Sequence, residues 1–212
     1  MSSAQPETPA LAAATAMFVE ILVVGIGFVA SLAMLAAAAA GPQTTAKAAP
    51  VAGSTPATGA SLAAAYALGI LVDRAADKAL ARVRRRLRQA TFPSDSTYAQ
   101  ARLALTTVPS LVALADYARS RMRICRGWIL NTALLTIAGD LLLLRYNVEH
   151  PIPLLALTTV LGLGVTAGFY FSWYTITATG YRKLAQQTAT LAATTPLSPQ
   201  QNSMPTTSGT VD

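Results

Sequence analysis

Three long apolar runs constrain the fold of this chain more than any other feature. They lie at residues 11–40, 128–144 and 152–176, and the last run contains no charged residue. A helix needs about 20 residues to cross the hydrocarbon core of a bilayer. Only helices and closed barrels satisfy every backbone polar group in lipid. The sequence therefore predicts an all-α, polytopic integral membrane protein, and the mean hydropathy of +0.44 agrees with that class.

A fourth span is indicated less directly. Residues 55–72 are rich in Ala, Gly and Thr, and only 62–72 is strongly apolar. Small residues are common in membrane helices because they let neighbouring helices approach closely. We favour a span at 58–80, which gives about four transmembrane helices with both termini on one side. The alternative is three spans, with the N-terminus on the opposite side.

A dense basic block separates the second and third spans. Twelve of the sixteen Lys and Arg residues fall between Arg74 and Arg126. Because cationic loops are retained on the cytoplasmic side, the block is predicted to be cytoplasmic under either topology. The predicted order is an N-terminal polar segment 1–10, span 11–40, external linker 41–57, span 58–80, basic cytoplasmic helical hairpin 81–127, span 128–146, external loop 147–151, span 152–176 and cytoplasmic disordered tail 177–212.

Helical periodicity predicts that the basic block is folded. Small and apolar residues recur at helical spacing across 76–90, and cations fill the other faces. The helix is expected to continue directly from the second span and to end before Pro93, because proline disfavours helix in the preceding residue. Asp95 or Ser96 is expected to cap the next helix, at about 97–107.

The cations of this block exceed the few that membrane orientation requires. They could bind anionic lipids, at roughly 1 kcal/mol per Lys or Arg near the surface, or dock an acidic partner protein. The simpler interpretation is that they only set topology and extend to the interface. Nucleic acid is not an expected partner, since no aromatic side chains interleave with the arginines. The candidate lipid- or partner-binding residues are Arg82, Arg84, Arg85, Arg86, Arg88, Arg119, Arg123 and Arg126.

Two carboxylates fall within the apolar runs, where charged groups often mark function. Residues 21–40 alone can span, so Glu20 is expected at the inner interface beside Asp73 and Arg74, with Arg74 as its structural partner. Asp140 must lie within the outer half of its helix. It is expected to be protonated, to face a water-filled cavity, or to bond to Thr, Ser or Tyr groups of neighbouring helices. An ion or proton pathway and a packing contact both remain open.

Small-residue pairs predict close helix packing in two spans. Gly27 and Ser31 form one pair, and Gly164 and Gly168 form a GxxxG pair in the last span. The aromatic residues of 169–174 are typical of a membrane-interface belt on the cytoplasmic side.

No catalytic, cofactor or metal motif occurs in the sequence, and a single histidine and a single cysteine provide no ligand cluster. We therefore expect no cofactor and no enzymatic activity. The leading hypothesis is a non-enzymatic membrane component that assembles with itself or with a membrane-protein partner and presents the basic hairpin. The alternative is a small transporter or pore subunit with Asp140 lining the path. The high alanine content suggests a bacterial inner membrane.

Overall fold

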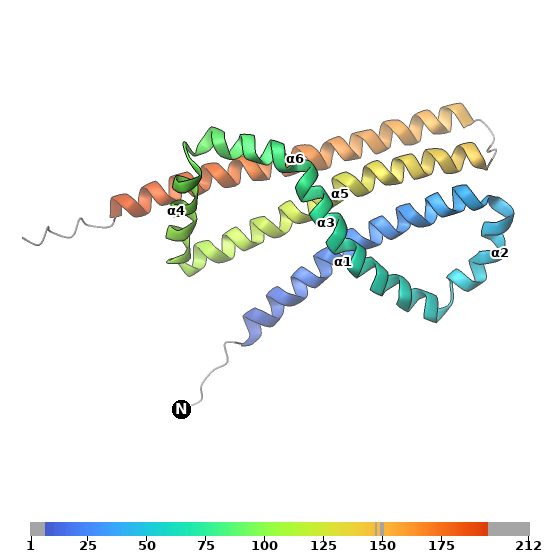
Figure 1. The fold of residues 1–212 in the computed structure, drawn as a ribbon, viewed down its shortest axis with the longest axis horizontal. Helices are drawn as coiled ribbons and strands as arrows, with labels where there is room; N and C mark the ends of the chain where they lie inside the picture. The colour runs from blue at the N-terminus through green and yellow to red at the C-terminus, as the bar shows by residue number, and fades with distance from the viewer. Residues whose placement is uncertain (1–6, 147, 149–150, 195–212) are drawn as a thin grey trace, which may run out of the picture.

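The computed structural model describes residues 7–146, 148 and 151–194, and these residues form helices joined by short connections (Figure 1). No strand occurs in this part of the chain, so the predicted all-α class is confirmed. In chain order the helices are α1 (Glu7–Ala40), α2 (Pro42–Ala52), α3 (Thr55–Thr91), α4 (Asp95–Thr106), α5 (Pro109–Arg145) and α6 (Pro151–Thr194).

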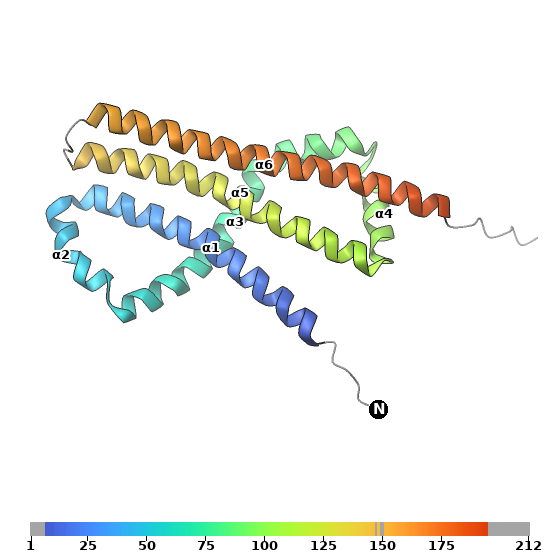
Figure 2. The same ribbon diagram turned by 180° about the vertical axis from the view of Figure 1, so that it is seen from behind.

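Four of these helices are long and apolar enough to cross a membrane, namely α1, α3, α5 and α6. The weakly apolar region near residue 60 is part of α3, a single continuous helix of 37 residues. The structure therefore favours four spans over three. The predicted linker 41–57 contains the short helix α2, which connects the ends of α1 and α3 (Figure 2).

The four long helices α1, α3, α5 and α6 are each longer than a membrane is thick. At about 1.5 Å per residue, α5 extends over about 55 Å and α6 over about 66 Å, against a hydrocarbon core of about 30 Å. Each helix therefore continues beyond its span. The C-terminal parts of α3 and α6 and the N-terminal part of α5 come together with α4 at one end of the molecule (Figures 1 and 2).

The ends of α3 and α4 follow the local sequence. Helix α3 ends at Thr91, just before Pro93, as expected. The cap of α4 differs from the predicted Asp95 or Ser96: it is Ser94, whose hydroxyl oxygen accepts a hydrogen bond from the backbone N–H of Thr97 at 3.1 Å. Ser94 has the extended backbone that this position requires, whereas Asp95 already lies in the first turn.

The predicted disordered tail 177–212 is wrong for its first part. Helix α6 continues to Thr194 because its apolar residues find a binding surface on α4. Leu184 is buried against Phe92 and Ala101, and aromatic rings pack edge-on around them. Residues 195–212 lie outside the described part of the chain, as do 1–6 and most of the predicted loop 147–151. Residues 7–10 of the predicted polar segment belong to α1.

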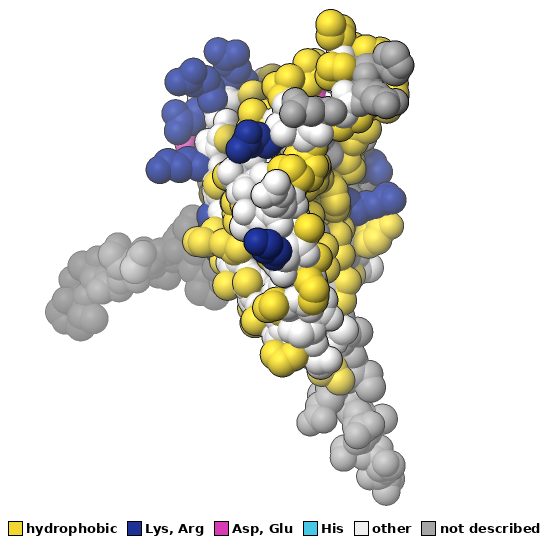
Figure 3. All heavy atoms as spheres, turned by 90° about the vertical axis from the view of Figure 1, so that its right-hand side faces the viewer, with side chains coloured by type: hydrophobic (Ala, Val, Ile, Leu, Met, Phe, Trp, Pro, Cys, Tyr) yellow, Lys and Arg dark blue, Asp and Glu magenta, His cyan; other side chains and the backbone are white. Residues whose placement is uncertain are grey.

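Glycines allow α1 to cross α3 at backbone contact. A Cβ on Gly25 would overlap the carbonyl oxygen of Ala65, and a Cβ on Gly69 would overlap that of Ile21. This close crossing holds the second span to the first, although α3 offers few large apolar residues. Seen from the end that carries α2, apolar side chains are interspersed with uncharged polar side chains and backbone, and isolated Lys or Arg side chains lie on the near face (Figure 3).

Candidate functional site

The candidate site is the basic end of the molecule, which we define as residues 73–126 and 177–194. It contains fourteen Lys and Arg residues but only four Asp and Glu residues. The carboxylates are too few to neutralise the cations, so the arrangement of ion pairs decides which arginines stay free. Helices α3, α4, α5 and α6 all contribute side chains to it.

Arg126 of α5 is the centre of an ion-pair network with α3. Its guanidinium donates to Asp73 at 2.5 Å and also to Asp77, which accepts a further hydrogen bond from Arg84. The side chains of Arg126 and Asp73 are each only 16% exposed. Removing one partner of a pair with this little exposure is costly, because it leaves a poorly solvated charge. The network therefore fixes the two basic helices against each other.

Glu20 joins α1 to the same end of α5, but not through the residue that was predicted. It is buried, and it accepts hydrogen bonds from the Ser120 hydroxyl and, at 3.3 Å, from Arg123. The predicted Glu20–Arg74 pair is therefore wrong. The reason is that Glu20 faces α5, while Arg74 is exposed on α3 and lines the groove described below.

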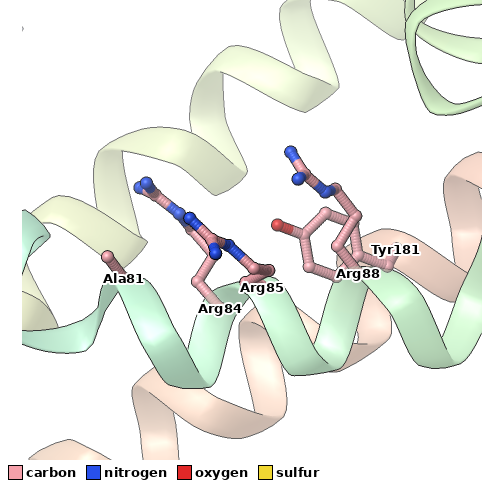
Figure 4. Close-up of a pocket in the computed structure, with 5 residues that line it drawn as sticks. All are labelled: Ala81, Arg84, Arg85, Arg88 and Tyr181. Carbon is pink, nitrogen blue, oxygen red and sulfur yellow. The ribbon is translucent and has the colours of Figure 1, made fainter. Parts of the chain in front are cut away.

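A small pocket of about 180 Å³ lies between α3 and α6 (Figure 4). Arg84, Arg85 and Arg88 line it from one side, with Ala81, and the Tyr181 hydroxyl points into the same space. Arg88 donates to Asp95 at 2.9 Å, but its buried Nε has no acceptor. Arg85 has no acidic partner among the described residues. The pocket therefore presents several hydrogen-bond donors and no carboxylate.

Tyr181 is held in this pocket by aromatic contacts and stays protonated. Its ring packs edge-on against Phe92 and Tyr98, at centroid distances of 6.4 and 5.8 Å. Burial raises the pKa of the Tyr181 hydroxyl, and nearby arginines only partly oppose that effect. The hydroxyl is therefore a hydrogen-bond donor at neutral pH. The sequence analysis missed this residue, because aromatic residues just after a span are usual in interface belts.

The pocket adjoins a larger groove of about 850 Å³, with which it shares Arg84, Arg88 and Tyr181. The groove has a mixed lining. Eight cations contribute to it, against the two carboxylates Asp73 and Asp77. The cations are Arg74, Arg84, Arg88, Arg102, Arg119, Arg123, Arg126 and Lys183. Large apolar side chains line the rest, among them Met17, Ile21, Ile70, Leu105, Leu111 and Trp173.

The eight predicted binding arginines thus fall into three groups. Those bonded to carboxylates inside the fold are Arg84, Arg88, Arg123 and Arg126, and Arg119 pairs with Asp116 on its own helix at 2.9 Å. Arg85 lines the pocket. Arg82 and Arg86 are exposed and line neither cavity. The sequence could not separate these groups, because helical periodicity does not say which acidic residue of another helix lies opposite.

Asp140 lies far from this end, in a row of polar contacts between α5 and α6. Its two carboxyl oxygens accept hydrogen bonds from the hydroxyls of Thr158, at 2.6 Å, and Thr159, at 2.8 Å. Hydroxyl partners on a neighbouring helix were one of its three expected environments. One turn closer to the basic end, Gly162 lies against Thr136. The row continues with Thr166, which donates to Thr132 at 2.9 Å. We call these contacts the polar ladder.

The predicted small-residue pairs differ in their packing. Gly27 lies under the fully buried Asn131, whose amide donates to the carbonyl of Val24 at 2.6 Å, and Ser31 is fully buried nearby on α1. By contrast, a Cβ on Gly164 or Gly168 would meet no atom within 4 Å. The GxxxG pair therefore makes no close helix contact within the described chain.

Within residues that the structure describes, no three His, Cys, Asp or Glu side chains are close enough to hold a metal ion. The fold and the four candidate spans define the class as an all-α polytopic integral membrane protein. Comparison with protein-family models, with curated proteins and with solved structures finds no match.

Proposed function

We propose that this protein is a non-catalytic integral membrane protein that binds anionic groups at its basic end. The observation that carries the proposal is the mixed groove, which eight cations and two carboxylates line. Five of the eight cations form ion pairs, and three, Arg74, Arg102 and Lys183, form none within the described residues. The remaining donors line a cavity whose volume of about 850 Å³ is typical of ligand sites.

We propose further that the basic end faces the cytoplasm and that the membrane is a bacterial inner membrane. The orientation rests on the positive-inside bias, because the opposite end of the bundle has only Lys47 and Arg145 as cations among its described residues. The membrane type rests on the high alanine content of the chain. A Lys47→Cys variant should then react with a membrane-impermeant thiol reagent from outside intact cells, whereas Arg86→Cys should not.

Two kinds of anionic partner fit the groove, a lipid of the membrane itself and an acidic segment of another membrane protein. Assembly with such a protein or with a second copy is part of the proposal. The exposed Gly164 and Gly168 surface of α6 is available for it, since none of the described helices covers these glycines. Purification in mild detergent from native membranes would show a protein partner as a co-purifying chain.

The direct test is binding of the full-length protein, in neutral nanodiscs, to an acidic probe such as polyglutamate. Substitution of Arg74, Arg102 and Lys183 by Gln should weaken binding and reduce its salt dependence, because these three cations line the groove and form no ion pair within the described chain. The matched control, Lys47→Gln with Arg145→Gln, changes two cations at the other end and should leave binding unchanged. Equal losses in both variants would contradict the proposal.

The transporter alternative gains no support from the position of Asp140. Both carboxyl oxygens are occupied by threonine hydroxyls, and Asp140 lines neither the pocket nor the groove. Its contacts explain it as a polar link between two helices, which is a common use of such residues in membranes.

A further inference from the structure

We propose that the pocket of Figure 4 binds the phosphate of an anionic glycerophospholipid, whose acyl chains lie along the apolar part of the adjoining groove. This inference rests on the proposed function and narrows the anionic partner to a lipid. It assigns Arg85 and Tyr181 as the residues that distinguish this site from the general positive charge of the basic end.

The donors of the pocket suit a phosphate group. Arg84 and Arg88 lie one helical turn apart on α3, with Arg85 beside Arg84, and Tyr181 completes the ring from α6 (Figure 4). Guanidinium groups bind phosphate oxygens through paired, charge-assisted hydrogen bonds. Arg85 lines the pocket and has no carboxylate partner among the described residues. A phosphate in the pocket would supply the acceptor that Arg85 lacks.

The groove explains why the ligand should carry hydrocarbon. From the shared residues Arg84, Arg88 and Tyr181 the lining extends to Met17, Ile70 and Trp173, which belong to three membrane-spanning helices. A free phosphate or an inorganic anion would leave this apolar part of the groove uncovered. An acidic peptide would place charged side chains against it. A lipid satisfies both ends, because its headgroup is anionic and its chains are apolar.

The pocket also lies at a suitable depth. The predicted second span ends at residue 80, so Arg84 begins about 6 Å beyond it along α3. The headgroup region of a bilayer occupies about 5–8 Å on each side of the hydrocarbon core. A lipid that remains in the leaflet can therefore reach the pocket without leaving the membrane, and its chains can enter the groove from the side of the spans.

Trp173 provides a local probe for the acyl chains. It lines the groove, and its side chain is only 3% exposed. A Trp128→Phe variant of the full-length protein leaves Trp173 as its single tryptophan. In vesicles of phosphatidylcholine, brominated phosphatidylglycerol should quench Trp173 more strongly than brominated phosphatidylcholine at the same mole fraction. In this background, Arg85→Gln should reduce the apparent preference for phosphatidylglycerol at least about ten-fold, the loss expected for a charge-assisted hydrogen bond to the phosphate. Tyr181→Phe should also reduce it, since the ring is kept and only the hydroxyl is lost.

The matched control is Arg86→Gln, which removes an exposed cation one residue further on that lines neither cavity. It should reduce the preference by no more than about five-fold, the general effect of one surface cation, and should leave the thermal stability unchanged. Equal losses for Arg85→Gln and Arg86→Gln would overturn the site but leave anion binding at the basic end intact. Displacement of the lipid by soluble glycerophosphate at comparable concentration would overturn the role of the acyl chains. Absence of any preference in the Trp128→Phe protein, together with absent polyglutamate binding, would refute the proposed function as well.

Discussion

The crossing of α1 and α3 permits a sharp test of the fold, because it depends on backbone contact at two glycines. In a Gly25→Ala variant, the new Cβ would overlap the carbonyl oxygen of Ala65 and lie 2.5 Å from its carbonyl carbon. Carbon atoms in ordinary contact are about 3.5–4.0 Å apart. The two helices must therefore separate locally by at least about 1 Å, and the contacts on both sides of the crossing weaken.

We expect Gly25→Ala to lower the free energy of unfolding by about 2 kcal/mol, within the range for overpacked interiors. The assay is unfolding of the purified protein in mixed detergent micelles, followed by tryptophan fluorescence. Gly164→Ala is the matched control, because a Cβ on Gly164 meets no atom within 4 Å. It should leave stability unchanged or raise it by up to about 1 kcal/mol, since alanine is the better helix former.

A second readout reports the separation itself. The rings of Phe18 and Tyr66 are in contact near the crossing, with centroids 5.0 Å apart. Cysteines at these two positions, with Cys125 replaced by Ser, should be cross-linked by a short bifunctional thiol reagent, and Gly25→Ala should slow that reaction. Gly25→Ala combined with Gly69→Ala should cost less than the sum of the single variants, because the first separation already makes room for the second Cβ. A Gly25→Ala protein that unfolds and cross-links like the control would refute the close crossing.

Three further outcomes are expected. Arg126→Gln should lower the free energy of unfolding by about 3 kcal/mol, because Asp73 and Asp77 lose their shared cation, whereas Arg86→Gln should change it by less than about 0.5 kcal/mol. Proteoliposomes containing Asp140→Asn should show the same proton and ion permeability as wild type; a wild-type flux that this variant abolishes would contradict the proposed function. Burial raises the pKa of Cys125, so its alkylation should be slow at neutral pH and rise as the solution becomes more alkaline, and fast reaction at neutral pH would contradict the described burial.

The sequence predicts the helices of this protein well because their determinants are local. Apolar length defines the four spans, and Pro93 ends α3 where steric rules place the end. The continuity of the second span with the basic helix that follows it also results from one uninterrupted periodic pattern. The error at the start of α4 is a shift of one or two residues, since Ser94, Asp95 and Ser96 are all good caps and only backbone geometry selects among them.

The contacts between helices were much less predictable. The sequence did not show which neighbouring helix Glu20 faces, so its partners Ser120 and Arg123 on α5 were missed. The helical continuation of α6 was missed because residues 184–194 look polar in isolation. Their fold depends on Leu184 and on apolar residues of α4 that are about eighty positions earlier in the chain. Such contacts join residues that are far apart in the chain, so the local pattern of a single sequence does not predict them.

The polar ladder has a consequence for how α5 and α6 find their alignment during folding. Between two apolar helices in lipid, many sliding positions bury similar surfaces, and the hydrophobic effect does not choose among them. A slip by one turn, about 5.4 Å, would set Asp140 opposite Leu154 and Leu155 or opposite Gly162 and Leu163, where no hydroxyl could reach it. Asp140 therefore fixes the register of α6 against α5. Because α6 is one continuous helix, this register also determines the position of Tyr181, about 30 Å further along α6 and beside the arginines of α3.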